Sequence, residues 1–405
     1  MLIANPRATR ASYPAELRTI MSTERAQESR RWLSAWSGIA SEATPLYDLP
    51  DIAKRLSVAR FSVKDESVRS PLGSFKALGA PIALVRQILR LHPDFDPAAI
   101  LKGRYAEQLK RYTVISATDG NHGRGLAAAA RDAGCRCVIV LHANVSMERE
   151  EAIAGLGAQI VRIKGNYDAS VEEAARLAEA SGWQVISDTS YEGYEEIPRD
   201  VMQGYGVIAA EIIDQTRAQP NEAGGFTHVL LQGGVGGMAA GLISFLWEHH
   251  GAHRPHFIVV EPVQADCLLQ SAMQGHAARA TGSVDSVMAG LACGEASPLA
   301  WRFLATSVDH FMTIEDEQAI EAMRSLAKGS EKDIPIVAGE SGTAGLAALE
   351  ILRGDTGLSM QVKLDSRSRV LIVNTEGATA PQVYEQLIGE SAEAVAARQA
   401  AWLAR

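Results

Sequence analysis

The sequence predicts an α/β protein built from two open, doubly wound sheets. Short, continuous apolar runs recur from residue 113 onward. Helical segments of about ten to fifteen residues separate them, an alternation typical of parallel strands buried on both faces. The chain has 405 residues, whereas single cores stop growing at roughly 250–300 residues, so we expect two domains. Polar or glycine-rich loops follow several runs, which is where open α/β sheets bind ligands.

The elements follow from these patterns in chain order. Before residue 113 we expect a helix over 23–36, a strand over 57–64 and a helix from Phe75 to about His92. The regular alternation then predicts strand 113–117, helix 125–133, strand 137–141, helix 147–155, strand 159–163, helix 170–180, strand 184–187 and helix 201–215. After a polar loop at 217–226 it predicts strand 228–231, helix 238–249, strand 256–260, a helix from 265, strand 310–314, helix 316–327, helix 341–352 and strand 370–374.

Composition and charge narrow the class of protein. The chain is 47% hydrophobic and 21% charged with a net charge of −9, which argues against a nucleic-acid partner. Its four cysteines do not form a disulfide framework for a chain of this length, although Cys267 and Cys293 could meet in the fold. We find no secretory signal and no apolar run of about 18 residues. We therefore expect a cytoplasmic enzyme with no membrane partner.

Lys76 stands just after the Pro/Gly-rich turn Ser70–Ser74, where a helix is predicted to begin. Phe75 and Leu78 make its surroundings apolar. Desolvation would disfavour the ammonium form and turn the amine into a nucleophile or base. On these residues alone, a lysine that extends from a helix N-terminus to water is the commoner alternative.

A glycine loop, Gly233-Gly234-Val235-Gly236-Gly237, joins a strand to a helix. Its bare backbone N–H groups at a helix N-terminus predict a phosphate site. No Lys-Ser/Thr pair follows, so nucleoside triphosphate hydrolysis is not indicated. A dinucleotide site remains open because Glu261 ends the next strand. A tight turn without a ligand is the simpler alternative.

Other polar loops follow predicted strands. Thr118-Asp119-Gly120-Asn121-His122-Gly123 carries more polar groups than one helix cap needs, and we expect it to bind a substrate carboxylate. Further polar loops lie at 187–194, 339–343 and 374–377. A desolvated lysine, a phosphate site without triphosphate chemistry and a carboxylate-binding loop together indicate pyridoxal phosphate, which needs a Schiff-base lysine and a phosphate site.

From about Thr44 onward the chain resembles the fold-type-II pyridoxal-phosphate enzymes, the tryptophan synthase β and threonine dehydratase group. Within that group it is most similar to the diaminopropionate ammonia-lyase family. The matching blocks include 64–67, 75–79, Asp119 to Gly125, 166–168, 188–189 with 192–194, 197–198, 202–205, 259–262, Met288 to Glu295, 339–342 and 375–377. The resemblance implies a homodimer that degrades 2,3-diaminopropionate to pyruvate and ammonia.

The resemblance also implies roles for single residues. Lys76 would hold the cofactor and take the α-proton of the L-substrate. Asp119 would be the base for the D-isomer, and Asp188 would position the substrate's β-amino group. Gly233, Gly234, Val235, Gly236 and Gly237 would bind the phosphate, Asn121 the ring hydroxyl and Thr375 the pyridine nitrogen. No metal is implied.

The domains that follow are a large cofactor-binding domain of residues 1–80 and 200–405, and a smaller substrate-loop domain of residues 81–199. The segment Ser70-Pro71 departs from the arginine, phenylalanine and glycine expected there in close relatives. Two other functions stay open. One is a dehydratase of serine, threonine or hydroxyaspartate, in which a small residue is expected in place of Asp119. The other is a metabolite-binding module in which Lys76 is structural.

Overall fold

The computed structural model describes residues 1–118, 120–143, 145–165, 167–217 and 225–405. Its contacts divide the chain into two compact units. Unit 1 comprises residues 1–23, 43–68 and 208–405, and unit 2 comprises residues 24–42 and 69–207. The two doubly wound sheets predicted from the sequence are confirmed, one in each unit. The domain boundaries predicted at 80/81 and 199/200 stay a prediction.

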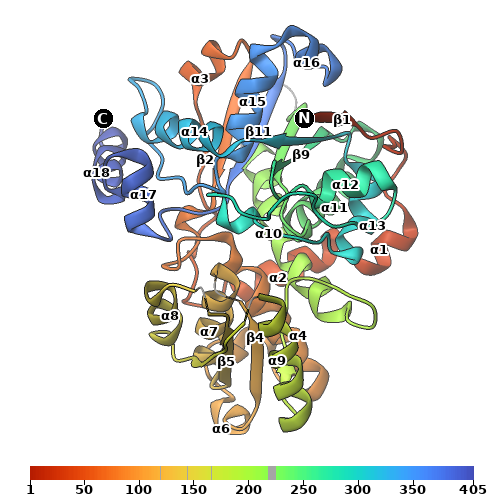
Figure 1. The fold of residues 1–405 in the computed structure, drawn as a ribbon, viewed down its shortest axis with the longest axis vertical. Helices are drawn as coiled ribbons and strands as arrows, with labels where there is room; N and C mark the ends of the chain where they lie inside the picture. Colours follow the sequence, from red (N-terminus) through yellow and green to blue (C-terminus); the bar gives the residue numbers. More distant parts are fainter. Residues whose placement is uncertain (119, 144, 166, 218–224) are drawn as a thin grey trace. The chain divides into compact units, whose positions relative to one another are not determined.

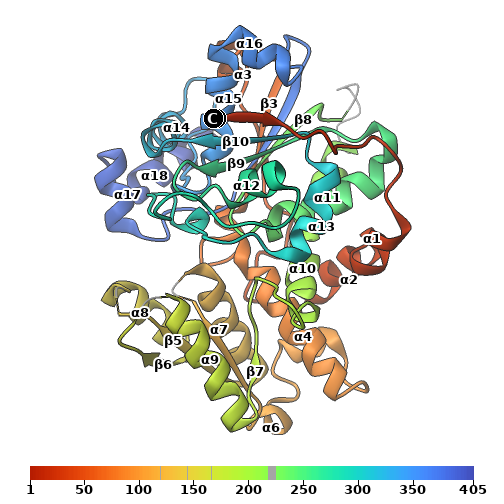
Figure 2. The same cartoon turned by 45° about the vertical axis from the view of Figure 1, so that its right-hand side comes forward.

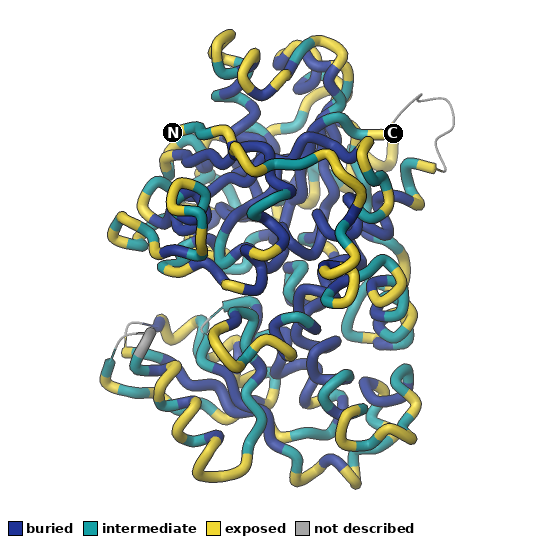
Figure 3. The backbone as a smooth tube through the Cα atoms, turned by 90° about the vertical axis from the view of Figure 1, so that its right-hand side faces the viewer, coloured by how far each residue is buried: buried dark blue, intermediate teal, exposed yellow. Residues whose placement is uncertain are grey.

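Unit 1 contains a seven-stranded sheet in the order β1-β10-β9-β8-β11-β3-β2. Its strands are β1 (Leu2–Ala4), β2 (Leu46–Asp48), β3 (Arg60–Asp65), β8 (His228–Gln232), β9 (His256–Pro262), β10 (His310–Ile314) and β11 (Arg369–Asn374). The five inner strands are parallel, while β1 and β2 pair antiparallel at the two edges. Every residue of β8, β9 and β10 is buried (Figure 3), as expected for continuous apolar strands covered on both faces.

Helices cover both faces of this sheet (Figure 1). On one face, α3 (Pro50–Arg55), α14 (Asp316–Lys328) and α15 (Ala344–Gly354) contribute to a core with alternate strand residues such as Leu230 and Ile372. The other face carries α11 (Gly237–His250), α12 (Cys267–Gln274) and α13 (Pro298–Ser307). Three sets of peripheral helices complete the unit: α1 (Ala15–Ile20), α16 (Thr356–Gln361), and α17 (Pro381–Ile388) with α18 (Ala392–Leu403).

Unit 2 contains a four-stranded, fully parallel sheet in the order β6-β5-β4-β7. The strands are β4 (Thr113–Ala117), β5 (Arg136–Leu141), β6 (Gln159–Arg162) and β7 (Gln184–Val185). Helix α9 (Tyr167–Ser181) packs on one face through Ala174 and Ala178, and α7 (Asn121–Ala133) on the other (Figure 2). The remaining helices are α2 (Thr23–Leu33), α4 (Gly79–Leu91), α5 (Pro97–Ile100), α6 (Ala106–Leu109), α8 (Met147–Ala154) and α10 (Glu196–Arg217), which continues into unit 1.

The single helix predicted from Phe75 to about His92 is interrupted. Residues Phe75–Ala77 form a 3-10 turn, and α4 begins only at Gly79. The Ser74 hydroxyl accepts the N–H of Lys76 at 3.3 Å and so caps this turn. Lys76 therefore stands on a short turn that precedes α4.

Close backbone contacts with α7 and α10 fix this turn. A Cβ atom on Gly204 of α10 would lie 2.3 Å from the Leu78 carbonyl oxygen. One on Gly125 of α7 would lie 3.0 Å from the Lys76 carbonyl oxygen, and one on Gly79 would lie 2.6 Å from the Tyr205 ring. A side chain at Gly79 or Gly204 would force a shift, so α7 and α10 hold the backbone on either side of Lys76.

No described helix is both long and apolar enough to span a bilayer. Within the described ranges we also find no cluster of three His, Cys, Asp or Glu residues suited to a metal ion. None of the four cysteines, including Cys267 and Cys293, forms a disulfide.

We predict that Gly204→Ala destabilises the protein, because the new methyl group would overlap the Leu78 carbonyl. Overpacking of this kind costs roughly 1–3 kcal/mol, which thermal and urea unfolding will measure. Gly354→Ala is the matched control, since a Cβ atom at this exposed end of α15 meets nothing within 4 Å; its stability should stay within about 0.5 kcal/mol of the wild type. Equal stabilities of the two variants would contradict the close approach.

Candidate active site

Lys76 and Asp188 form an ion pair in unit 2, in which the ammonium group of Lys76 donates a hydrogen bond to Asp188 Oδ2. The two side chains are 22% and 24% exposed, so both are largely withdrawn from water. The Lys76 Nζ atom also lies 5.4 Å from the centroid of the Phe75 ring and 5.9 Å from that of Tyr205. The apolar surroundings predicted for this lysine are present, and a carboxylate accompanies them.

His122 and Tyr205 complete this cluster. His122 is buried on the first turn of α7; its Nε2 atom lies 3.0 Å from the Ile186 carbonyl oxygen, and Nδ1 lies 3.8 Å from Asp188 Oδ2. Burial lowers the pKa of His122, although the Asp188 charge opposes the shift. The imidazole is therefore neutral at pH 7. Burial raises the pKa of Tyr205, which leaves its phenol protonated.

The carboxyl group of Asp188 is ionised throughout the neutral range. Burial raises its pKa, but the charge of Lys76, the hydrogen bond from Lys76 and smaller contributions together outweigh burial and hold the pKa well below its usual value. Because His122 is neutral at pH 7, Lys76 is the cation responsible. The structure thus places a primary amine and an ionised carboxylate in direct contact. Because a carboxylate favours the charged form of a neighbouring amine, Asp188 is suited to bind an ammonium group.

A tyrosine holds the loop that carries Asp188. The Tyr194 hydroxyl accepts the Ser187 N–H at 2.9 Å and donates to the Val185 carbonyl at 3.0 Å. Gly193, with φ of 79°, allows the reversal between these contacts. The ordinary polar loop predicted at 187–194 is therefore closed on the end of β7, and Asp188 is fixed at this strand end.

The second predicted loop of unit 2 is described in part. Asp119 lies outside the described residues. Asn121 begins α7, and its Oδ1 atom accepts a hydrogen bond from Arg124 at 3.5 Å. The N-cap residue of α7 is Gly120, with no side-chain cap. Capping, the simpler alternative for this loop, therefore does not explain Asn121.

The glycine loop of unit 1 fits a bound phosphate group. Gly233 directly follows β8, and α11 begins at Gly237 with Gly236 as an N-cap that supplies no side chain. Gly236 has φ of 95°, which favours glycine. A Cβ atom on Gly233 would lie 2.7 Å from Glu261 Cγ, so side chains are excluded behind the loop. The N–H groups of the first turn of α11 are left for an anion.

The structure changes two sequence predictions, the open possibility of a dinucleotide site and the start of the helix predicted at residue 341. Glu261 is completely buried and accepts the N–H groups of Leu268 and Leu269, each at 2.8 Å. It is therefore not placed to bind a ribose, which removes the support for a dinucleotide site. The helix predicted over 341–352 begins only at Ala344, and the Ser341 hydroxyl before it accepts the Gly290 N–H at 2.9 Å. Thr375 follows β11 and is buried.

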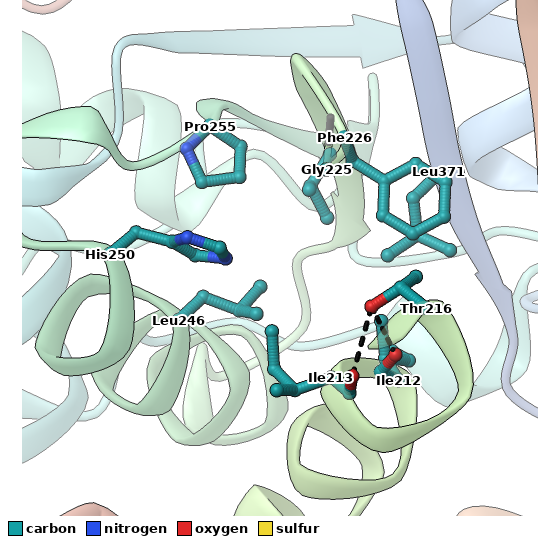
Figure 4. Close-up of a pocket in the computed structure, with 10 residues that line it drawn as sticks. Ile212, Ile213, Thr216, Gly225, Phe226, Leu246, His250, Pro255 and Leu371 are labelled. Carbon is teal, nitrogen blue, oxygen red and sulfur yellow. Dashed lines mark hydrogen bonds between the residues drawn. The ribbon is translucent and has the colours of Figure 1, made fainter. Parts of the chain in front are cut away.

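Figure 4 shows a small apolar pocket elsewhere in unit 1. Phe226 and Pro255 line it, and they lie just before β8 and β9, at the amino ends of the strands. The Thr216 hydroxyl beside it donates to carbonyl groups of its own helix. The pocket contains none of the predicted site residues, and the glycine loop lies at the other end of β8.

Sequence reasoning missed three contributors to these clusters. Tyr205 lies in the predicted helix 201–215 and Tyr194 in the predicted polar loop 187–194. Neither carries a local signal of a role in the site. His122 belongs to the polar loop predicted at 118–123, but its contact with the Ile186 carbonyl and its position beside Asp188 could not be predicted from the sequence. The high density of polar groups at 118–123 and 187–194 could have indicated that the two loops lie together. Both loops follow strands that pair side by side in one sheet.

Comparisons with known proteins agree with these features. A family model described as "Pyridoxal-phosphate dependent enzyme" matches residues 40–376. Diaminopropionate ammonia-lyase of Escherichia coli K12 is 35% identical over 95% of this chain and 96% of its own, and that of Salmonella typhimurium LT2 is 37% identical over 85% and 87%. A crystal structure of the Escherichia coli enzyme with an aminoacrylate-PLP azomethine reaction intermediate has a TM-score of 0.85, with 33% identity over 96% of each chain.

We predict that Asp188→Asn destabilises the ligand-free protein most at neutral pH. The depressed pKa of Asp188 means that its charge contributes stability above the unfolded-state pKa of about 3.9. This contribution is lost as the pH falls through the folded-state pKa. Urea unfolding from pH 7 to pH 3 should show a gap between wild type and variant that narrows with acid. Glu192→Gln, an exposed change on the same loop, should give no such trend, and a pH-independent gap for Asp188→Asn would contradict the ion pair.

Proposed function

The chain belongs to the family of pyridoxal-phosphate dependent enzymes, and from this premise we propose that it eliminates ammonia from 2,3-diaminopropionate to give pyruvate. The observation that carries this proposal is the contact between Lys76 and Asp188. One group is an amine for the cofactor's aldehyde; the other is an ionised carboxylate suited to an ammonium group on the substrate. A β-amino substrate supplies that ammonium group, whereas a β-hydroxy substrate would leave the carboxylate without a cation, which is unfavourable.

The cofactor is pyridoxal 5′-phosphate. Lys76 would hold it covalently, Gly233, Gly234, Val235, Gly236 and Gly237 would bind its phosphate, Asn121 would contact its ring hydroxyl and Thr375 its pyridine nitrogen. When bound, the cofactor acidifies the substrate's α-proton by accepting electron density. The uncapped first turn of α11 and the left-handed Gly236 support the phosphate assignment.

The side chains of the protein would move the protons. Lys76 would take the α-proton of the L-substrate, and Asp119 that of the D-substrate. Loss of the α-proton and cleavage of the β-carbon–nitrogen bond release one ammonia. The remaining three-carbon enamine takes up one water to give pyruvate and a second ammonia. Asp188 would keep the β-nitrogen protonated, because a nearby carboxylate favours the ammonium form, which is the better leaving group.

The oligomeric state and the cellular location also belong to the proposal. We propose a homodimer, as the resemblance implies, and light scattering on the purified protein tests it. We also propose a cytoplasmic location. The four cysteines form no disulfide and two of them are buried, which is compatible with a reducing compartment.

We predict that purified protein releases pyruvate from DL-diaminopropionate at a kcat/KM about 100-fold or more above those for L-serine and hydroxyaspartate. Lys76→Ala should lose both this activity and the visible absorption of the bound cofactor. Lys102→Ala, which removes an exposed lysine of the same unit, should keep both. Serine as the clearly better substrate would overturn the assignment in favour of a dehydratase, and a colourless wild-type protein would support a non-catalytic binding module.

We predict that Asp119→Asn loses turnover of D-diaminopropionate by about 10²–10⁴-fold, the usual contribution of a general base. Turnover of the L-isomer should stay within a few-fold of the wild type, because Lys76 serves that face. Asp188→Asn is the matched comparison and should lower both turnovers similarly, since it acts on the β-nitrogen. Equal losses of both isomers in Asp119→Asn would remove the two-base assignment.

A further inference from the structure

Glu261 is a buried carboxyl group that the proposed reaction does not use. It stands at the end of β9, is 0% exposed, and receives three hydrogen bonds. The N–H groups of Leu268 and Leu269 donate to its two oxygens at 2.8 Å each, and the Cys267 thiol donates to Oε1 at 3.7 Å. These donors are the first three residues of α12. The carboxyl group of Glu261 thus caps α12 from a neighbouring strand.

The start of α12 packs directly on the glycine loop. One methyl group of Leu268 lies 3.1 Å from the position of a Cβ atom on Gly233, and the other lies 3.2 Å from that position on Gly236. The Cys267 thiol also donates to the Gly234 carbonyl at 3.4 Å. Together with the contact of Glu261 Cγ behind Gly233, these contacts link the capping carboxyl group to three residues of the loop.

We propose that Glu261 is a positioning residue for the phosphate-binding loop: its carboxyl group holds the start of α12 against Gly233–Gly236 and so fixes the backbone N–H groups that bind the cofactor's phosphate. The inference rests on the proposed role of this loop in cofactor binding. It adds that the affinity for phosphate depends on a side chain that does not touch it.

The charge of Glu261 gives this role a pH dependence. Burial raises its pKa to about 8, the hydrogen bonds from Leu268 and Leu269 oppose the shift, and the charge of Asp266 adds to it. The other titratable groups facing this site are the thiols of Cys267 and Cys293, and burial raises the pKa of Cys267. Glu261 is therefore mostly neutral at pH 7. Above pH 8 it becomes an anion behind a loop that binds another anion, and phosphate affinity should fall.

The test compares pyridoxal phosphate with pyridoxal, which lacks the phosphate. Cofactor-free protein is titrated with each. The dissociation constant of pyridoxal divided by that of pyridoxal phosphate measures the contribution of the phosphate, and we call this quotient the phosphate ratio. In wild type we expect this ratio to fall between pH 7 and pH 9. The amide of Glu261→Gln can accept only one of the two N–H groups, so the affinity for pyridoxal phosphate should fall about tenfold. The affinity for pyridoxal should change less than about twofold. Because the amide does not titrate, the phosphate ratio of this variant should not change with pH.

Ser271→Ala is the matched control. The Ser271 hydroxyl is buried in the same helix and bonds to the Cys267 carbonyl and the Ala278 N–H. Its loss should lower stability but leave the phosphate ratio unchanged. If wild type binds no pyridoxal phosphate, the proposed cofactor role fails. If wild type binds it with a ratio that is constant from pH 7 to pH 9, or if folded Glu261→Gln keeps the wild-type ratio, the positioning role of Glu261 is overturned.

Discussion

A row of buried polar side chains crosses the carboxyl edge of the large sheet, and the loops of unit 1 depend on it. Glu261, Gln232, Asn374 and Asp65 stand at the ends of β9, β8, β11 and β3, which are consecutive in the sheet. None is more than 3% exposed. Parallel register brings them together, since Asn374 is level with Asp65 and Gln232 with the residue before Glu261.

Gln232 and Asn374 use their side-chain N–H groups to hold neighbouring segments. Gln232 donates to the Gly342 and Val373 carbonyls, at 3.0 and 2.7 Å. Asn374 donates to Asp65 and to the Val337 carbonyl, at 2.9 and 3.1 Å. A buried polar group without a partner costs about 1–3 kcal/mol, so displacing a loop from its partner is unfavourable. The row therefore makes the strand ends a support for the loops that follow them.

Local pattern predicted the frame well, because a strand buried on both faces must be apolar along its length. Strands 113–117 and 310–314 match the structure end to end. The break at Leu78 was not predictable, since it depends on Tyr205 and Gly204, more than 120 positions away, packing on the turn. Short edge strands β1 and β2 and the peripheral helices α16–α18 were also missed, because their few apolar residues give no clear period.

The same limit applies to the site. Glycines, hydroxyls and a lysine at strand ends are visible in the sequence because each has a local meaning. The pairing of Lys76 with Asp188 is not visible in the sequence, because the two residues are separated by 112 positions. Nothing local distinguishes Asp188 from other loop carboxylates. Glu261 shows the opposite error, since its position at a strand end suggested a ligand contact. Its burial and its hydrogen bonds from Leu268 and Leu269 show that it caps α12 instead.

The ion pair also suggests how one carboxylate can serve two states of the enzyme. An ionised group as buried as Asp188 needs a cation nearby. In the ligand-free protein Lys76 supplies it. Once the Lys76 amine is committed to the cofactor, the carboxylate needs a replacement, and the β-ammonium group of diaminopropionate carries the same charge on a similar primary amine. Serine offers only a neutral hydroxyl at that position. Selection of the substrate would then follow from the requirement of Asp188 for a counter-ion, as much as from the shape of the site.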